Sequence, residues 1–162
     1  MATCSQHITQ WIHNRQFLAT VTTDYPDWIV TSAFYVALHA VDAMLTNDKV
    51  TRVCNHDARL QVLMHTNKYL NINKCFLPLY DLSRTVRYLA DPMKWVPANL
   101  IEKEVFARYL YPIEKSVQER IGKDLGLASI TLTSPPSPIV PAVPKPGAPP
   151  VASPPTKPEM RK

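Results

Sequence analysis

The segment from Tyr25 to Asn47 constrains the fold more than any other part of the sequence, because it is apolar around most of a helical surface. Apolar residues recur there at three- and four-residue intervals in two rows, which predicts a helix with two packing partners. The rows are Ile29, Ala33, Val36, Ala40 and Met44, and Val30, Ala37, Val41 and Leu45. We therefore expect this segment to be the central helix of an all-α domain.

A third row on the same helix is polar and aromatic. It consists of Trp28, Ser32, Tyr35, His39 and Asp42, again at helical spacing. Such groups are costly to bury unless they form hydrogen bonds. We expect this row to meet partners from another helix or to line a cleft, and therefore to mark a functional site.

Four further amphipathic segments accompany the central helix, and none of them shows the alternation of a β-strand. We expect helices at about Ser5–Thr22, Asn55–Leu70, Lys74–Ala90 and Pro97–Gly122, with Asn71 and Asn73 as a break and Pro112 as a kink. The short connections predict an antiparallel bundle of four to five helices in one domain, residues 1–125.

Residues 126–162 are predicted to form a disordered, proline-rich tail. Eleven of the sixteen prolines lie between Pro135 and Pro158, among few large apolar residues. Motifs such as Pro135–Pro138 and Pro141–Pro144 resemble docking sites for SH3-type or WW-type domains. The alternative is a solvated tether without a partner.

Charge and cysteine content limit the class of protein only loosely. The tail carries +3 of the net charge of +5, so the predicted bundle is only mildly basic. Cys4, Cys54 and Cys75 form an odd set without a C-x-x-C pair, and no leader pattern is visible, which favours a reducing cytoplasm. Thr31, Ser32, His39 and Asp42 interrupt the longest apolar run, so we expect no membrane span.

Three polar clusters could carry chemistry. The first contains Tyr35, His39 and Asp42, in which Asp42 follows His39 by one turn and can orient its ring. A satisfied core histidine is the alternative. The second contains His56, Arg59 and His65, where an arginine could hold a phosphate while a histidine moves a proton. An ordinary charged helix surface is the alternative for this cluster.

The third cluster contains Ser83, Arg84, Arg87 and Tyr88. Two arginines about one turn apart suit a phosphate or a neighbouring carboxylate, so either a ligand or a structural ion pair would explain them. The sequence contains no H-x-x-x-H pair and no glycine-rich phosphate loop, and we expect neither a metal site nor a cofactor.

The order of these clusters resembles the HEPN family of small helical domains from bacteria and archaea. The resemblance covers about Phe17 to Ala90. It rests on Tyr25-Pro26-Asp27-Trp28, the segment from Ala33 to Ala43, His56-x-x-Arg59, and Tyr80-x-Leu82-Ser83-Arg84-x-x-Arg87-Tyr88. It implies a helical bundle, often a homodimer, and in many members a metal-independent ribonuclease of a toxin–antitoxin or defence system.

The family's nuclease signature is an arginine followed by a polar residue, and a histidine separated from the arginine by four to six intervening positions. Arg59 and His65 match this spacing, whereas Leu60 stands where the polar residue is usual. The resemblance implies catalysis by Arg59 and His65. The residues expected to bind RNA or a nucleotide are His39, Asp42, His56, Arg84, Arg87 and Tyr88. The alternative is a non-catalytic dimeric interaction module whose tail recruits a partner.

Overall fold

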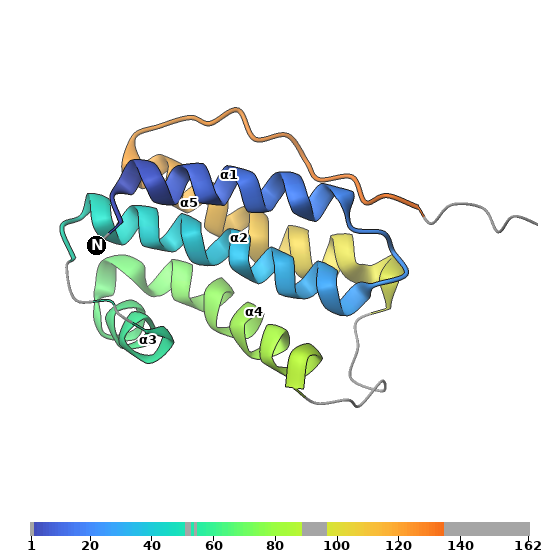
Figure 1. The fold of residues 1–162 in the computed structure, drawn as a ribbon. Helices are drawn as coiled ribbons and strands as arrows, with labels where there is room; N and C mark the ends of the chain where they lie inside the picture. The colour runs from blue at the N-terminus through green and yellow to red at the C-terminus, as the bar shows by residue number, and fades with distance from the viewer. Residues whose placement is uncertain (1, 51–52, 54, 89–96, 135–162) are drawn as a thin grey trace, which may run out of the picture.

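The chain folds into an antiparallel helical bundle. The computed structural model describes residues 2–50, 53, 55–88 and 97–134. Its α-helices are α1 (Cys4–Thr20), α2 (Pro26–Asn47), α3 (His56–His65), α4 (Leu70–Tyr88) and α5 (Tyr111–Ile121). The four longer helices alternate in direction along the bundle, and the short α3 lies beside the beginning of α4 (Figure 1). The predicted all-α bundle is therefore confirmed.

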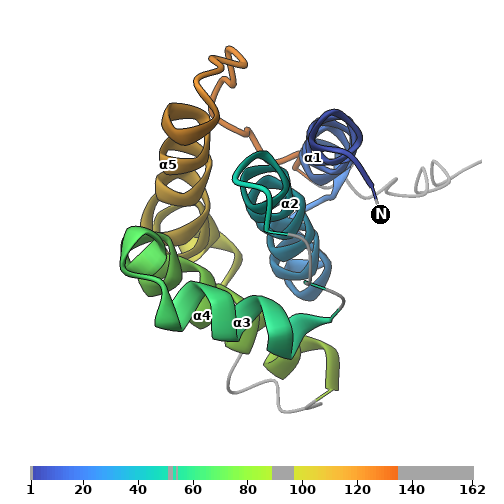
Figure 2. The same cartoon turned by 90° about the vertical axis from the view of Figure 1, so that its left-hand side faces the viewer.

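Helix α2 lies at the centre of the bundle. It contacts α1, α4 and α5, and the view along the bundle shows it between these three helices (Figure 2). Every residue of its two apolar rows is buried, as the sequence pattern predicts. α2 is long and apolar enough to cross a membrane, but 78% of its most apolar window is buried within the bundle, as in the core helix of a globular fold.

The beginning of α4 differs from the predicted boundary. A 3₁₀ turn, Asn67–Tyr69, leads directly into α4 at Leu70, so Asn71 and Asn73 lie within the helix rather than breaking it. Ile72 and Phe76 are buried in the core from this first part of α4. Tertiary burial thus outweighs the weak helix propensity of asparagine. Pro78 also lies inside α4.

The last helical region consists of three parts instead of one kinked helix. A 3₁₀ turn, Ala98–Leu100, precedes a π-helix, Glu102–Leu110, which continues into α5. Pro112 lies in the first turn of α5, where its missing N–H costs little. Gly122 ends α5 with a φ of 64°, the left-handed conformation that glycine adopts without strain.

The segment that follows α5 returns along the bundle and packs on it (Figure 1). Ile130 is buried, and its N–H donates to the Tyr111 hydroxyl over 2.9 Å. The Thr23 N–H donates to the Thr133 carbonyl over 3.1 Å. Residues 127–133, which composition assigned to the tail, therefore contact the helices. The proline-rich residues 135–162 lie outside the described part of the chain, as does Cys54.

Asp48 joins three elements at the C-terminal end of α2. Its Oδ2 accepts hydrogen bonds from the Tyr69 hydroxyl at 2.6 Å and from Lys68 Nζ and Arg120 Nε at 2.8 Å each. Burial alone would raise the pKa of this carboxyl, but the three hydrogen bonds together lower it from 3.8 to about 2. The carboxylate therefore stabilises the fold while it is ionised.

We expect Asp48→Asn to lower the free energy of unfolding by about 1–2 kcal/mol at pH 7, since charged hydrogen bonds are lost but two of the partners are partly exposed. Because the folded-state pKa is depressed, this difference should shrink as the pH falls from about 4 towards 2. Urea unfolding across this pH range measures it. The exposed Asp81→Asn variant on α4 is the control, and equal effects of both substitutions would contradict the role of Asp48.

Candidate functional site

A buried ion pair between α2 and α3 organises the predicted site. Arg59 Nε lies 2.7 Å from Asp42 Oδ1, and Arg59 Nη2 lies 2.9 Å from Asp42 Oδ2. Only 8% of the Arg59 side chain and 14% of the Asp42 side chain are exposed. The two parallel bonds fix both the position and the plane of the carboxylate. The Arg59 guanidinium is therefore already bound by the Asp42 carboxylate and is not available at the surface.

His56 extends this pair towards α4. Its Nδ1 lies 3.3 Å from Arg59 Nη1, and its ring packs 5.7 Å from the Phe34 ring and 5.3 Å from the Tyr80 ring. Burial is the main cause that lowers the pKa of His56, and the charges of Arg59 and Arg87 lower it further. The neutral imidazole can accept a hydrogen bond from Arg59, so the cluster favours that form.

His39 faces α1 rather than α3. Its Nδ1 lies 3.3 Å from the Nδ1 of His7, and the two ring centroids are 5.6 Å apart. Burial lowers the pKa of His39, the charge of His7 lowers it further, and Asp42 opposes both effects. A ligand atom of Asp42 lies within 4.8 Å of those of both histidines. This proximity could not be predicted from the sequence, because His7 belongs to another helix.

The third predicted cluster forms a basic and aromatic surface at the end of α4. The Arg87 guanidinium lies 5.2 Å from the centre of the Tyr88 ring and 5.9 Å from that of Tyr35, and Nη1 is 3.4 Å from the Tyr35 hydroxyl. Arg84 lies 5.6 Å from the Tyr80 ring. Tyr88 is 74% exposed, and a surface cavity of about 360 Å³ lies between Asp81, Arg84, Thr85 and Tyr88.

These contacts connect Arg59 with the residues that we expected to bind a ligand. His65, the other residue that we expected to be catalytic, is not part of this network. Arg59 joins Asp42 to His56, and the Phe34 and Tyr80 rings join His56 to Arg87 and Arg84. His65 is exposed at the end of α3, and within the described residues no hydrogen bond, ion pair or shared cavity joins it to Arg59. The six-residue separation places the two side chains on different faces of α3.

The polar row of α2 also borders a groove, as we expected. Thr31, Ser32, Tyr35 and His39 line a cavity of about 260 Å³ together with residues of α1. Trp28 and Phe17 border the same cavity and are 56% and 51% exposed. Polar groups and two large exposed aromatic side chains therefore line the same groove.

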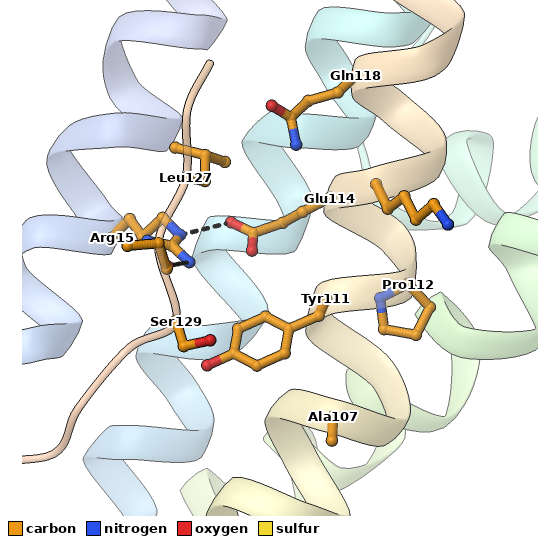
Figure 3. A pocket seen from close by; sticks show the side chains of 10 residues that line it. Arg15, Ala107, Tyr111, Pro112, Glu114, Gln118, Leu127 and Ser129 are labelled. Atoms are coloured by element: carbon orange, nitrogen blue, oxygen red, sulfur yellow. Dashed lines mark hydrogen bonds and ion pairs between the residues drawn. The ribbon is translucent and has the colours of Figure 1, made fainter. Parts of the chain in front are cut away.

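A larger cavity lies elsewhere and was not predicted. It measures about 480 Å³ and lies beside Arg15 and Glu114 (Figure 3). Glu114 Oε1 accepts hydrogen bonds from Trp11 Nε1 at 2.8 Å and from Arg15 Nε at 2.9 Å. Burial raises the pKa of Glu114, against the effect of both donors. The sequence contained one sign of this site. Glu114 lies one helical turn from the apolar residues Leu110 and Val117, on a face of the helix that is buried in the structure.

Comparisons of the chain with protein-family models, curated proteins and solved structures find no match. The arguments about function therefore rest on the site itself.

We expect Arg59→Met to lower the free energy of unfolding by about 3–5 kcal/mol, because it leaves the Asp42 carboxylate buried without its partner. The double variant Asp42→Ala with Arg59→Met should be more stable than Arg59→Met alone, since no buried charge remains. Urea unfolding of the single and double variants measures this coupling. Strictly additive effects would show that the ion pair does not couple the two helices.

Proposed function

We propose that this chain is a HEPN-like helical domain that binds single-stranded RNA or a nucleotide at the basic and aromatic surface of Tyr35, Arg84, Arg87 and Tyr88. The observation that carries the proposal is the packing of Arg87 between Tyr35 and the highly exposed Tyr88, with Arg84 beside the neighbouring cavity. Exposed rings offer stacking platforms for bases, and arginines offer bidentate contacts to phosphate.

The geometry favours binding over cleavage. A metal-independent ribonuclease of the toxin or defence type needs Arg59 and His65 at one phosphodiester. Arg59 is instead bound at both carboxylate oxygens of Asp42, and His65 is exposed at the far end of α3. Cleavage by this pair would require Arg59 to leave Asp42, or His65 to act across a homodimer. The free thiols of Cys4 and Cys75 are compatible with the cytoplasmic location of such a protein.

We expect the double variant Arg84→Ala with Arg87→Ala to weaken binding of labelled single-stranded RNA by about tenfold or more, because phosphate contacts are lost. Tyr88→Ala should weaken it as well, since it removes a stacking platform. Fluorescence anisotropy in EDTA measures both effects, and the wild-type affinity should fall as salt increases. Arg108→Ala, an exposed arginine paired with Glu104 on the π-helix, is the matched control.

Unchanged RNA affinity in the Arg84 and Arg87 double variant would contradict the assigned surface. The same samples test catalysis. RNA cleavage in EDTA that disappears in His65→Gln would support the nuclease, and this exposed position can be changed without disturbing the core. Binding without cleavage would support the RNA-binding function alone.

A second candidate is a non-catalytic homodimeric interaction module whose proline-rich tail recruits an SH3-type or WW-type partner, or an antitoxin. The observation that favours it is the exposure of Phe17, Tyr25 and Trp28, which are each more than half exposed close to the groove of α1 and α2. Large exposed aromatic side chains in proximity are typical of protein interfaces.

We expect the double variant Phe17→Ser with Trp28→Ser to weaken self-association by at least about tenfold, because aromatic side chains dominate the energy of most interfaces. Sedimentation equilibrium measures the monomer–dimer constant. Met64→Ser, which removes an exposed apolar side chain from α3, is the control. A monomeric wild-type protein, or a dimer that is insensitive to the double substitution, would contradict this candidate.

A further inference from the structure

Two helices bring three potential metal ligands together beside the Asp42–Arg59 pair. His7 from α1 and His39 from α2 place their Nδ1 atoms 3.3 Å apart. A ligand atom of Asp42, one turn after His39, lies within 4.8 Å of both imidazoles. In the part of the chain that the structure describes, this is the one group of three histidine, cysteine or acidic side chains with such proximity.

The separation of the two nitrogens is that of two ligands of one metal ion. Zn–N bonds of about 2.0–2.1 Å at a tetrahedral angle place two nitrogen ligands roughly 3.3 Å apart. The observed distance is the same. The Asp42 carboxylate beside the two nitrogens would supply the third ligand.

The surroundings of Asp42 are those of a metal-binding carboxylate. Its two oxygens accept hydrogen bonds from Arg59, which fixes their orientation and leaves further lone pairs for an ion. Ligands of metal ions are commonly oriented in this way by a surrounding set of hydrogen bonds. The positive charge of Arg59 disfavours a nearby cation. The bonds that the ion would form with one carboxylate and two imidazoles offset this repulsion.

The three side chains are accessible to an ion from solvent. His7 and Asp42 line a cavity of about 350 Å³, together with Thr46 and Lys49, and each of the three candidate ligands is only partly buried. Both helices are anchored in the core next to the site, since Trp11 of α1 and Val41 of α2 are fully buried. The ligands are therefore held on rigid elements, as a specific site requires.

We propose that His7, His39 and Asp42 form a binding site for a divalent transition metal ion of the Zn²⁺ class. The ligands are imidazole nitrogens of His7 and His39 and a carboxylate oxygen of Asp42. Water occupies the fourth position of a tetrahedral site with three protein ligands. The site joins the beginning of α1 to α2. It uses other side chains than the surface that we propose for RNA, which consists of Tyr35 on α2 and Arg84, Arg87 and Tyr88 on α4.

The test uses the full chain without a polyhistidine tag. After treatment with EDTA and its removal, the protein is titrated with Co²⁺ and with Zn²⁺ in the absence of RNA. We expect one ion per chain, a visible absorption band of tetrahedral Co²⁺ that Zn²⁺ displaces, and a higher melting temperature with Zn²⁺. His7→Gln and His39→Gln should each reduce the affinity by at least about 100-fold.

His13→Gln and His65→Gln are the matched controls, because both histidines are exposed and the first lies on α1 itself. They should leave the stoichiometry and the Co²⁺ band unchanged. Circular dichroism confirms that each variant is folded. The absence of saturable binding would overturn the proposal, and so would an affinity that His7→Gln does not change. Because no RNA is present, either outcome leaves the RNA-binding proposal unaffected.

Discussion

The burial of α2 on three sides is the constraint on which the rest of the structure depends. α1, α4 and α5 all pack against this helix, so its two apolar rows are enclosed. A helix in this position has only one remaining direction for polar side chains. His39 and Asp42 project there, and each needs a partner because an unpaired polar group at a helix interface is costly. The ion pair with Arg59 and the contact with His7 are consequently formed along this side of α2.

Asp42 determines how this polar region is arranged. Its carboxylate is paired with Arg59 of α3, and Arg59 in turn contacts His56. The pairing attaches a short helix, with only two buried residues, to the central helix. The same carboxylate lies close to the imidazoles of His7 and His39 on its other side. Asp42 therefore lies where polar side chains of α1, α2 and α3 meet.

The surface proposed to bind RNA depends on this arrangement indirectly. The Phe34 and Tyr80 rings enclose His56, and Arg87 lies 5.7 Å from the centre of the Phe34 ring. Aromatic packing thus holds α4 in register with α2 and α3. Arg84, Arg87 and Tyr88 are then presented on the outer side of α4 beside Tyr35. The polar core and the exposed surface are two ends of one continuous contact network.

The sequence predicted some helix boundaries correctly and others wrongly. Pro26 and Asn47 bound α2 as its pattern predicts, and Asn55 caps α3 through a hydrogen bond to the Ala58 N–H. The beginning of α4 was predicted four residues too late. Asparagine disfavours a helix locally, whereas the burial of Ile72 and Phe76 favours one only once the core exists. Local signals are therefore reliable where no long-range contact opposes them.

The sequence by itself determined the class of fold and the face of α2 that carries polar groups, because helical periodicity is a local property of the chain. Only the tertiary structure decided which groups meet. Arg59 turns to Asp42 and not to His65, His7 meets His39, and Glu114 meets Trp11 and Arg15. These partners are distant in the sequence, so their proximity depends on how the helices pack, which periodicity does not specify.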